Sequence, residues 1–435
     1  MHACGSYLHA CGSLFACLRN FYLFPASFNP STFMRTLLTL MAAAVVLTGC
    51  ADAETKLEQK AARIHAAAYT VDSHTDTPLR INRMGFDFGV RNDPRETRSK
   101  IDLPRMKEGG MDGIWFAVFI GQGERSPEGN QKAMKQALEI TDGIYKTIDL
   151  YSDDLEVATK ADDLVRIAKK GKHAIYLGLE NGYPIGNNPD LLETFYEKGI
   201  RYVTLVHTRN NDICDSSNDS LEHNGLTLLG EDVVGRMNDL GMLIDVSHAS
   251  DKSFYDVIEK SRAPIIASHS CARALCDNPR NLSDEMLLNL KENGGVIQMC
   301  ILSAYVKTPA PNPQRDSARA AVREKHGNYY ELDEAGKEAF ITDWYAIDRD
   351  FPREMATVSD AVNHIDHMVE LIGIDHVGIG TDFDGGGGLE DCFDVSQMGN
   401  ITLELVRRGY SAGDIKKIWG GNLTRVFKEV EAAAI

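Results

Sequence analysis

Five side chains of the types that bind zinc lie along the chain, each near the end of a short apolar run: His74, Asp76, Glu180, His248 and His269. Zinc accepts neutral imidazole and carboxylate ligands, and a catalytic zinc keeps one position open for water. If the segment around His74 and Asp76 is extended, both side chains lie on one face, because strand side chains alternate with period two. The pattern indicates a site for two zinc ions, of the kind an enzyme uses.

The elements that must position these residues follow from the hydrophobic pattern. Eight apolar runs are predicted strands, at residues 69–74, 113–120, 173–180, 202–207, 242–248, 264–269, 295–301 and 376–382. Segments of helical periodicity lie between most of them, at 131–151, 190–198, 230–240, 250–261, 284–293 and 358–372. Strands that alternate with helices predict an α/β fold, a parallel (β/α)8 or TIM barrel.

The reactive side chains fall at one end of these predicted strands. His207 and Asp382 close their apolar runs, as the five candidate zinc ligands do. Active sites of (β/α)8 barrels form at the carboxyl ends of the strands. We therefore expect all seven side chains to converge on one face of the barrel.

Seven motifs carry a resemblance to a known family. They are Asp72–Asp76, Gly178–Gly182, Arg201–His207, Asp245–His248, Ser268–Ser270, Pro279–Asn281 and Gly378–Gly385. In this order, over about residues 60–430, the chain resembles the membrane (renal-type) dipeptidases of peptidase family M19, in the amidohydrolase superfamily. The resemblance implies a barrel of the metal-dependent hydrolase type and hydrolysis of dipeptides with free termini, including those with a C-terminal D-residue.

The resemblance also implies a ligand set for two zinc ions per chain. His74 and Asp76 would bind one ion, His248 and His269 the other, and Glu180 would bridge both. Two metals held about 3.5–4 Å apart can share a hydroxide and polarise the scissile carbonyl.

Four further residues have implied roles in catalysis and substrate binding. Asp382 resembles the general acid/base, with Asp384 as the nearby rival, and His207 the histidine that stabilises the oxyanion. Arg280 and Tyr305 match positions that hold the terminal carboxylate of the substrate. An arginine fork suits this task because it can grip a carboxylate with two parallel hydrogen bonds.

Two other functions stay open at this point. One is a different amidohydrolase reaction, such as hydrolysis of a β-lactam or an N-acyl amino acid, and the other is a non-catalytic binding or structural lipoprotein. The complete set of ligands and Asp382 argue against the second. Among other features, His364 and His367 are expected to line a helix face, His223 is unassigned, and Gly385–Gly388 is expected to be a flexible rim loop.

The start of the chain is predicted to be a processing signal. Residues 1–49 are interpreted as a leader and lipoprotein signal peptide, with Met34 as the true start, and Leu47–Cys50 resembles a bacterial lipobox. Lipidation of Cys50 would leave residues 50–59 as a tether on the periplasmic side of a membrane. The outer membrane is favoured over the inner membrane. An uncleaved anchor is the alternative, and no transmembrane helix is expected in the mature chain.

Composition limits the remaining choices. The formal net charge of −17 disfavours a nucleic-acid partner. Residues 60–435 are expected to form a single barrel domain with an insertion at about 307–354. Five cysteines follow Cys50, an odd number, so at least one should be unpaired. A homodimer is expected from the family resemblance alone.

Overall fold

The computed structural model describes residues 53–81, 86–329 and 332–435. The chain divides into two compact units, residues 1–62 and 63–435. In the first unit the described residues, 53–62, are helical. The predicted leader and Cys50 lie outside the described residues.

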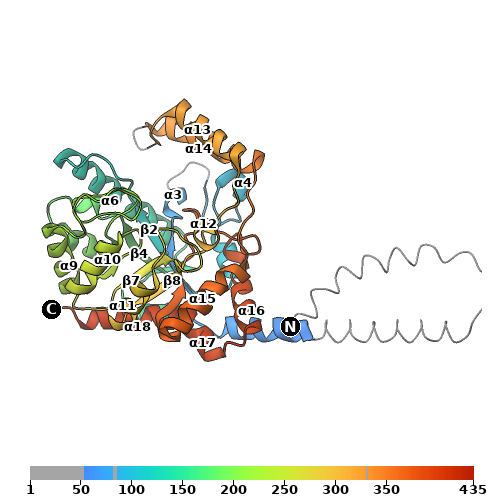
Figure 1. Ribbon diagram of the computed structural model, residues 1–435. Coiled ribbons are helices and arrows are strands. Elements are labelled where there is room, and N and C mark those ends of the chain that lie inside the picture. The colour runs from blue at the N-terminus through green and yellow to red at the C-terminus, as the bar shows by residue number, and fades with distance from the viewer. Residues whose placement is uncertain (1–52, 82–85, 330–331) are drawn as a thin grey trace, which may run out of the picture. The chain divides into compact units, whose positions relative to one another are not determined.

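The second unit contains a barrel of parallel strands (Figure 1). Its neighbouring strands run in the order β1 (Val71–Thr75), β2 (Gly113–Phe119), β4 (His173–Glu180), β5 (Ile200–Thr204), β6 (Leu243–Asp245), β7 (Ile266–Ser270), β8 (Val296–Met299) and β9 (Val377–Ile379). The barrel closes just beyond β9, where Thr75 and Phe383 form a parallel bridge. The predicted (β/α)8 barrel is therefore confirmed.

Two details of the strand prediction were wrong. A short strand, β3 (Leu155–Val157), pairs with β4 outside the barrel order, and three residues are too few to leave a clear pattern. The strands β5, β6 and β9 end at Thr204, Asp245 and Ile379, several residues before the predicted ends. The last residues of those apolar runs therefore belong to the connecting loops.

Helices surround the strands much as the periodicity predicts. The predicted helices correspond to α6 (Pro127–Leu150), α8 (Leu191–Glu197), α9 (Leu228–Leu240), α10 (Asp251–Lys260), α11 (Asp284–Glu292) and α15 (Val358–Ile372). Outside the predicted insertion, the structure also describes α3 (Pro78–Ile81), α4 (Pro94–Thr97), α5 (Leu103–Glu108), α7 (Asp163–Ala168), α12 (Ser303–Val306), α16 (Gly399–Arg407), α17 (Ala412–Lys416) and α18 (Asn422–Ala432). Local chemistry sets the boundaries: Thr357 and Asp360 form a capping box at the start of α15, and left-handed Gly241 ends α9.

Aromatic rings fill the barrel next to the site. Trp115 of β2 stacks on Tyr176 of β4 and on Tyr202 of β5, with ring centroids 4.6 and 5.1 Å apart. Gly178 makes room for one of these rings, since an added Cβ would lie 2.1 Å from the Tyr202 ring. The rigid packing positions the Tyr202 hydroxyl beneath the carboxyl ends of the strands.

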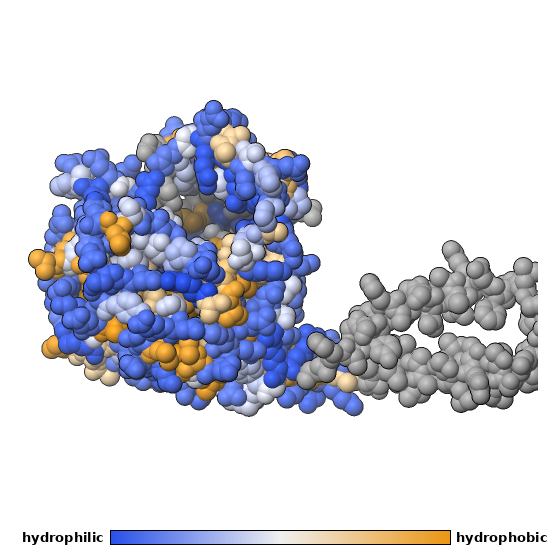
Figure 2. Space-filling model, viewed as in Figure 1, coloured by the Kyte–Doolittle hydropathy of each residue, from blue (hydrophilic) through white to orange (hydrophobic). Residues whose placement is uncertain are grey.

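The predicted insertion lies in the connection between β8 and α15. It contains a pair of helices, α13 (Pro313–His326) and α14 (Glu334–Asp350). In Figure 1 this helix pair stands out from the barrel, and Figure 2 shows the surface hollowed beneath it. Because the connection leaves from the carboxyl end of β8, the insertion belongs to the rim on which active sites of such barrels form.

Across the described ranges, none of the helices combines the length and the apolar character needed to cross a membrane.

Candidate metal centre

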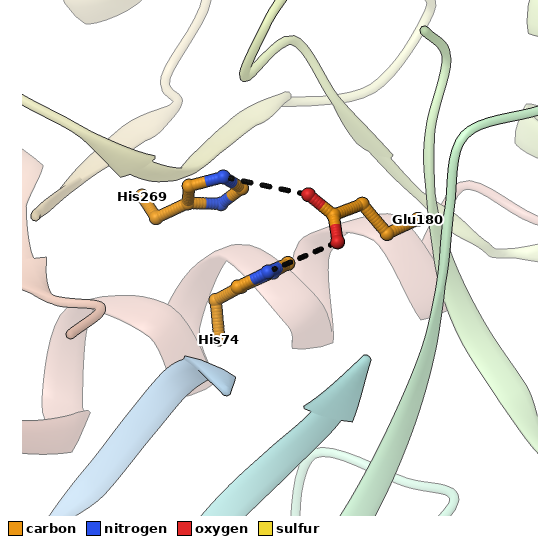
Figure 3. A group of neighbouring side chains, drawn as sticks. All are labelled: His74, Glu180 and His269. Carbon is orange, nitrogen blue, oxygen red and sulfur yellow. Dashed lines mark ion pairs between the residues drawn. The ribbon is translucent and has the colours of Figure 1, made fainter. Parts of the chain in front are cut away.

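Glu180, the last residue of β4, is the centre of a buried cluster of imidazole and carboxylate groups. Figure 3 shows its two oxygens pointing toward different histidines, His74 from β1 and His269 from β7. Oε2 lies 3.5 Å from Nε2 of His74, and Oε1 lies 3.7 Å from Nε2 of His269. Nε2 of His248 is also near Oε1, at 3.4 Å, and 3.0 Å from Nε2 of His269. One carboxylate thus faces two separate sets of candidate ligands.

A second carboxylate group completes the side of the cluster that contains His74. Oδ2 of Asp76 lies 3.8 Å from Nε2 of His74. Ligand atoms of His74, Asp76 and Asp382 all lie within 4.8 Å of one another. Gly385 leaves space for both aspartates, because an added Cβ would lie 2.0 Å from Asp76 Oδ2 and 2.3 Å from Asp382 Oδ1. The absence of a side chain at Gly385 is therefore a requirement of the site.

Unpartnered polar atoms show that this cluster fits a cation. Nε2 of His74, Oδ1 of Asp76 and Oε2 of Glu180 are buried and have no hydrogen-bond partner among the described residues. Each such atom costs about 1–3 kcal/mol when it is left unsatisfied. Imidazole nitrogen and carboxylate oxygen are zinc ligands, so a bound divalent metal would satisfy these atoms together.

Burial and mutual repulsion raise the pKa values of two carboxyl groups in the cluster. Burial, and then the charge of Asp76, raise the pKa of Glu180 to about 7. Burial raises the pKa of Asp382 well above its usual range, with further contributions from Cys300 and Asp76. Carboxyl groups whose pKa values are shifted in this way are characteristic of functional sites.

His207 lies beside the cluster, on the loop that follows β5. Its Nε2 lies 3.7 Å from Glu180 Oε1, and its ring centroid lies 4.2 Å from that of His248. Burial lowers the pKa of His207 to about 3, so the imidazole is neutral near pH 7. A neutral ring offers one N–H donor, and Nδ1 has no partner among the described residues.

Left-handed backbone aims two of the reactive side chains inward. His248 has a φ of 70° and Asp382 a φ of 59°, both beyond the ends of their strands. This region costs a non-glycine residue roughly 1–2 kcal/mol. The carbonyl of Asp382 recovers part of that cost by accepting main-chain hydrogen bonds from Gly386 and Gly387, at 3.0 and 2.6 Å. The glycine run, expected to be a flexible rim loop, forms a tight turn around Asp382.

Arg280 is fully buried at the edge of the cluster. Its guanidinium donates to Ser270 Oγ and to the carbonyl of His269, both at 2.9 Å, while Nε has no partner among the described residues. The guanidinium carbon lies 5.5 Å from the ring centre of Tyr305. Burial raises the pKa of Tyr305 to about 12, so its hydroxyl remains protonated. Both side chains can therefore donate to an anion.

Several other candidates have structural partners instead. Asp384, the rival of Asp382, accepts hydrogen bonds from Thr77, Ser99 and the main chain of Lys100. His364 and His367 do not form a metal pair. His364 accepts from the main-chain N–H of Ala272 and donates to the carbonyl of Val306, and His367 pairs with Asp284. His223 bonds the carbonyl of Asn211 through Nε2.

The residues that hold the candidate ligands in place were not predicted from the sequence. Tyr202 contacts His74, Asp72 contacts Thr381, and Asp245 contacts Ser268. All of them belong to the recognised motifs or adjoin a ligand, which was the available signal. Within the described ranges every cysteine is buried and free, namely Cys214, Cys271, Cys276, Cys300 and Cys392.

The fold and the site together define a class of protein, a (β/α)8 barrel with a candidate metal centre of carboxylates and histidines at the carboxyl ends of its strands. The sequence model of the membrane dipeptidases, peptidase family M19, matches residues 58–435. The chain therefore belongs to the membrane dipeptidase family, and it is a hydrolase of peptide bonds. The resemblance found in the motifs is confirmed.

Individual relatives agree with this assignment. Dipeptidase tcpJ of Claviceps purpurea is 32% identical over 375 residues, which cover 83% of this chain and 77% of the relative. Dipeptidase 3 of Rattus norvegicus is 32% identical over 374 residues, 83% of this chain and 65% of the relative. The crystal structure of the probable dipeptidase PvdM from Pseudomonas aeruginosa superposes with a TM-score of 0.76 at 32% identity, covering 87% of this chain and all of that one.

Proposed function

We propose that this protein is a dizinc dipeptidase that hydrolyses dipeptides with free termini, including those with a D-residue at the C-terminal position. The observation that carries the proposal is the orientation of Glu180, whose two oxygens face His74 and the pair His248 and His269 separately. His74 and Asp76 would hold one ion, His248 and His269 the other, and Glu180 both. Bound zinc supplies Lewis acidity and lowers the pKa of water in the site.

Two residues of the chain then carry out proton transfer and stabilisation of the oxyanion. Asp382 takes a proton from the attacking water and delivers it to the departing amine, a task that suits a carboxyl group whose pKa is raised by burial. His207 is neutral and donates a hydrogen bond to the oxyanion that develops on the scissile carbonyl. Neither step requires a serine or cysteine nucleophile.

Arg280 and Tyr305 would select the substrate by its length. A free carboxylate can accept from the buried guanidinium and from the Tyr305 hydroxyl at the same time. A longer peptide would present a neutral amide to Arg280 and lose the charge-assisted contact. The tolerance of a D-residue is inferred from the family resemblance.

The proposed location rests on the N-terminal sequence. Cleavage before Cys50 and lipidation of that cysteine would anchor the enzyme on the periplasmic side of the outer membrane. Labelling with a radioactive fatty acid tests this, because Cys50→Ala should abolish both the label and the membrane-bound fraction. Label retained by the variant would contradict the anchor.

Hydrolysis of a small substrate panel by the purified protein tests the activity. The panel contains L-Ala-L-Ala, L-Ala-D-Ala, and their N-acetylated and C-amidated derivatives, with a β-lactam and an N-acyl amino acid for the other amidohydrolase reactions. We expect cleavage of the free dipeptides alone. Hydrolysis of only the β-lactam or the N-acyl amino acid would contradict the proposal.

A further inference from the structure

A buried carboxylate joins three neighbouring strands beside the metal centre. Asp245, the last residue of β6, is fully buried. Its Oδ2 accepts hydrogen bonds from Thr204 Oγ1 of β5 at 2.5 Å and from Ser268 Oγ of β7 at 2.6 Å. Its Oδ1 accepts from the main-chain N–H groups of Ser247 at 3.0 Å and Ser268 at 2.8 Å. Four donors therefore converge on one carboxylate, which fixes its orientation.

The hydrogen bond that Ser268 donates to Asp245 determines whether its hydroxyl donates to His269 or accepts from it. A hydroxyl has one hydrogen to donate, and the contact with Asp245 at 2.6 Å is much shorter than the alternative contact with Ser247 Oγ at 3.5 Å. Ser268 Oγ also lies 2.8 Å from Nδ1 of His269. Because the hydroxyl hydrogen is already used, Ser268 must accept at this contact, and Nδ1 of His269 must carry the proton.

This arrangement leaves the other ring nitrogen of His269 free for a metal. In a neutral imidazole with its proton on Nδ1, Nε2 has a lone pair. Nε2 is the atom that lies 3.7 Å from Glu180 Oε1 and 3.0 Å from Nε2 of His248. The two hydrogen bonds that link His269 to Ser268 and Ser268 to Asp245 form a relay. This relay fixes the tautomer of His269 whose Nε2 lone pair faces the cluster.

We propose that Asp245 and Ser268 are positioning residues that fix the tautomer and ring orientation of His269 and thereby set the affinity of the second metal, on the side of His248 and His269. This inference rests on the proposed dizinc function. The other side of the centre does not depend on the relay, because Nδ1 of His74 contacts Tyr202 Oη at 2.8 Å. Loss of the relay should weaken one ion and leave the other unchanged.

Zinc titration of the full chain, stripped of metal and followed with a competing chromogenic chelator, tests the proposal. In Ser268→Ala, Nδ1 of His269 has lost its partner, so one ion should bind as in the wild type and the other about 10–100-fold more weakly. Ser268→Thr keeps a hydroxyl and should restore most of the affinity. The matched control is Ser253→Ala, another buried serine, whose hydroxyl donates to the carbonyl of Asp215 at 2.9 Å and should not affect either ion.

Three results would overturn the relay. The first is wild-type affinity for both ions in Ser268→Ala. The second is an equal loss at both sites with a lower unfolding temperature, which would indicate general structural damage. The third is wild-type binding of both ions by Asp245→Asn, since an amide in place of the carboxylate would present a donor to Ser268. A wild-type chain that binds fewer than two ions would instead contradict the dizinc function itself, and the relay with it.

Discussion

The hydroxyl oxygen of Tyr202 lies 2.8 Å from Nδ1 of His74, and both side chains are fully buried. Burial raises the pKa of Tyr202, so the phenol keeps its proton at neutral pH. When Nδ1 of His74 carries the ring proton, it donates to the phenol oxygen and leaves Nε2 directed at Glu180. A residue of β5 therefore orients a candidate metal ligand of β1 across the barrel.

Tyr202→Phe should weaken binding of the zinc ion that we propose His74 and Asp76 hold. Loss of a partner that orients a metal ligand typically costs 10–100-fold in affinity, and the ion on the other side should bind as before. The control is Tyr176→Phe, because Tyr176 stacks on the same Trp115 but donates to the carbonyl of Lys160. Zinc titration of both variants measures the effect, and equal affinities in the two would refute it.

Glu180→Gln and Asp382→Asn should separate metal binding from proton transfer. Glu180 faces both sets of ligands, so its amide variant should lose most of both ions. Asp382→Asn should keep two zinc ions per chain and lower kcat by about 10²–10⁴-fold, the usual contribution of a general acid or base. Zinc content and kcat are measured on the same samples. Equal loss of metal in both variants would disprove this division of roles.

Arg280→Lys should reduce the preference for a free C-terminal carboxylate. A lysine lacks the planar fork, and loss of a hydrogen bond to a charged group costs about 1.5–3 kcal/mol, or roughly 10–150-fold in kcat/KM. Arg201→Lys is the control, because Arg201 is also buried over a tyrosine ring but bonds main-chain carbonyls. The ratio of kcat/KM for L-Ala-L-Ala and its amide should fall only in Arg280→Lys. An unchanged ratio in Arg280→Lys would show that Arg280 does not bind the carboxylate.

Acid should destabilise the fold partly through His364. Burial lowers the pKa of His364 from 6.5, and its two ring nitrogens are used by one donor and one acceptor of the main chain, which requires the neutral ring. Below pH 6.5 the unfolded chain therefore binds more protons than the native one. The stability contributed by His364 is complete above pH 6.5 and is lost as the pH falls.

Thermal unfolding between pH 7 and pH 5 measures this contribution. The decrease of Tm with falling pH should be shallower in His364→Gln than in the wild type, whereas His367→Gln, at a partly exposed position, should follow the wild type. An unchanged slope in His364→Gln would exclude His364 as the source.

The sequence predicted the barrel and the converging residues because buried parallel strands and their polar ends leave a strong pattern. It could not predict that His248 and Asp382 lie beyond their strands, where left-handed backbone turns them inward. Nor did it assign Asp245 or Ser268, although both lie in recognised motifs. Their hydrogen bonds join strands that are distant in sequence, and only the assembled barrel brings those partners together.

Zinc reconstitution of the metal-free protein, with hydrolysis of L-Ala-L-Ala followed at each addition, measures whether catalysis depends on two zinc ions. We expect no hydrolysis without metal and a rise in activity that saturates at two zinc ions per chain. Full activity of the metal-free protein, or two bound zinc ions with no hydrolysis of any free dipeptide, would contradict this expectation.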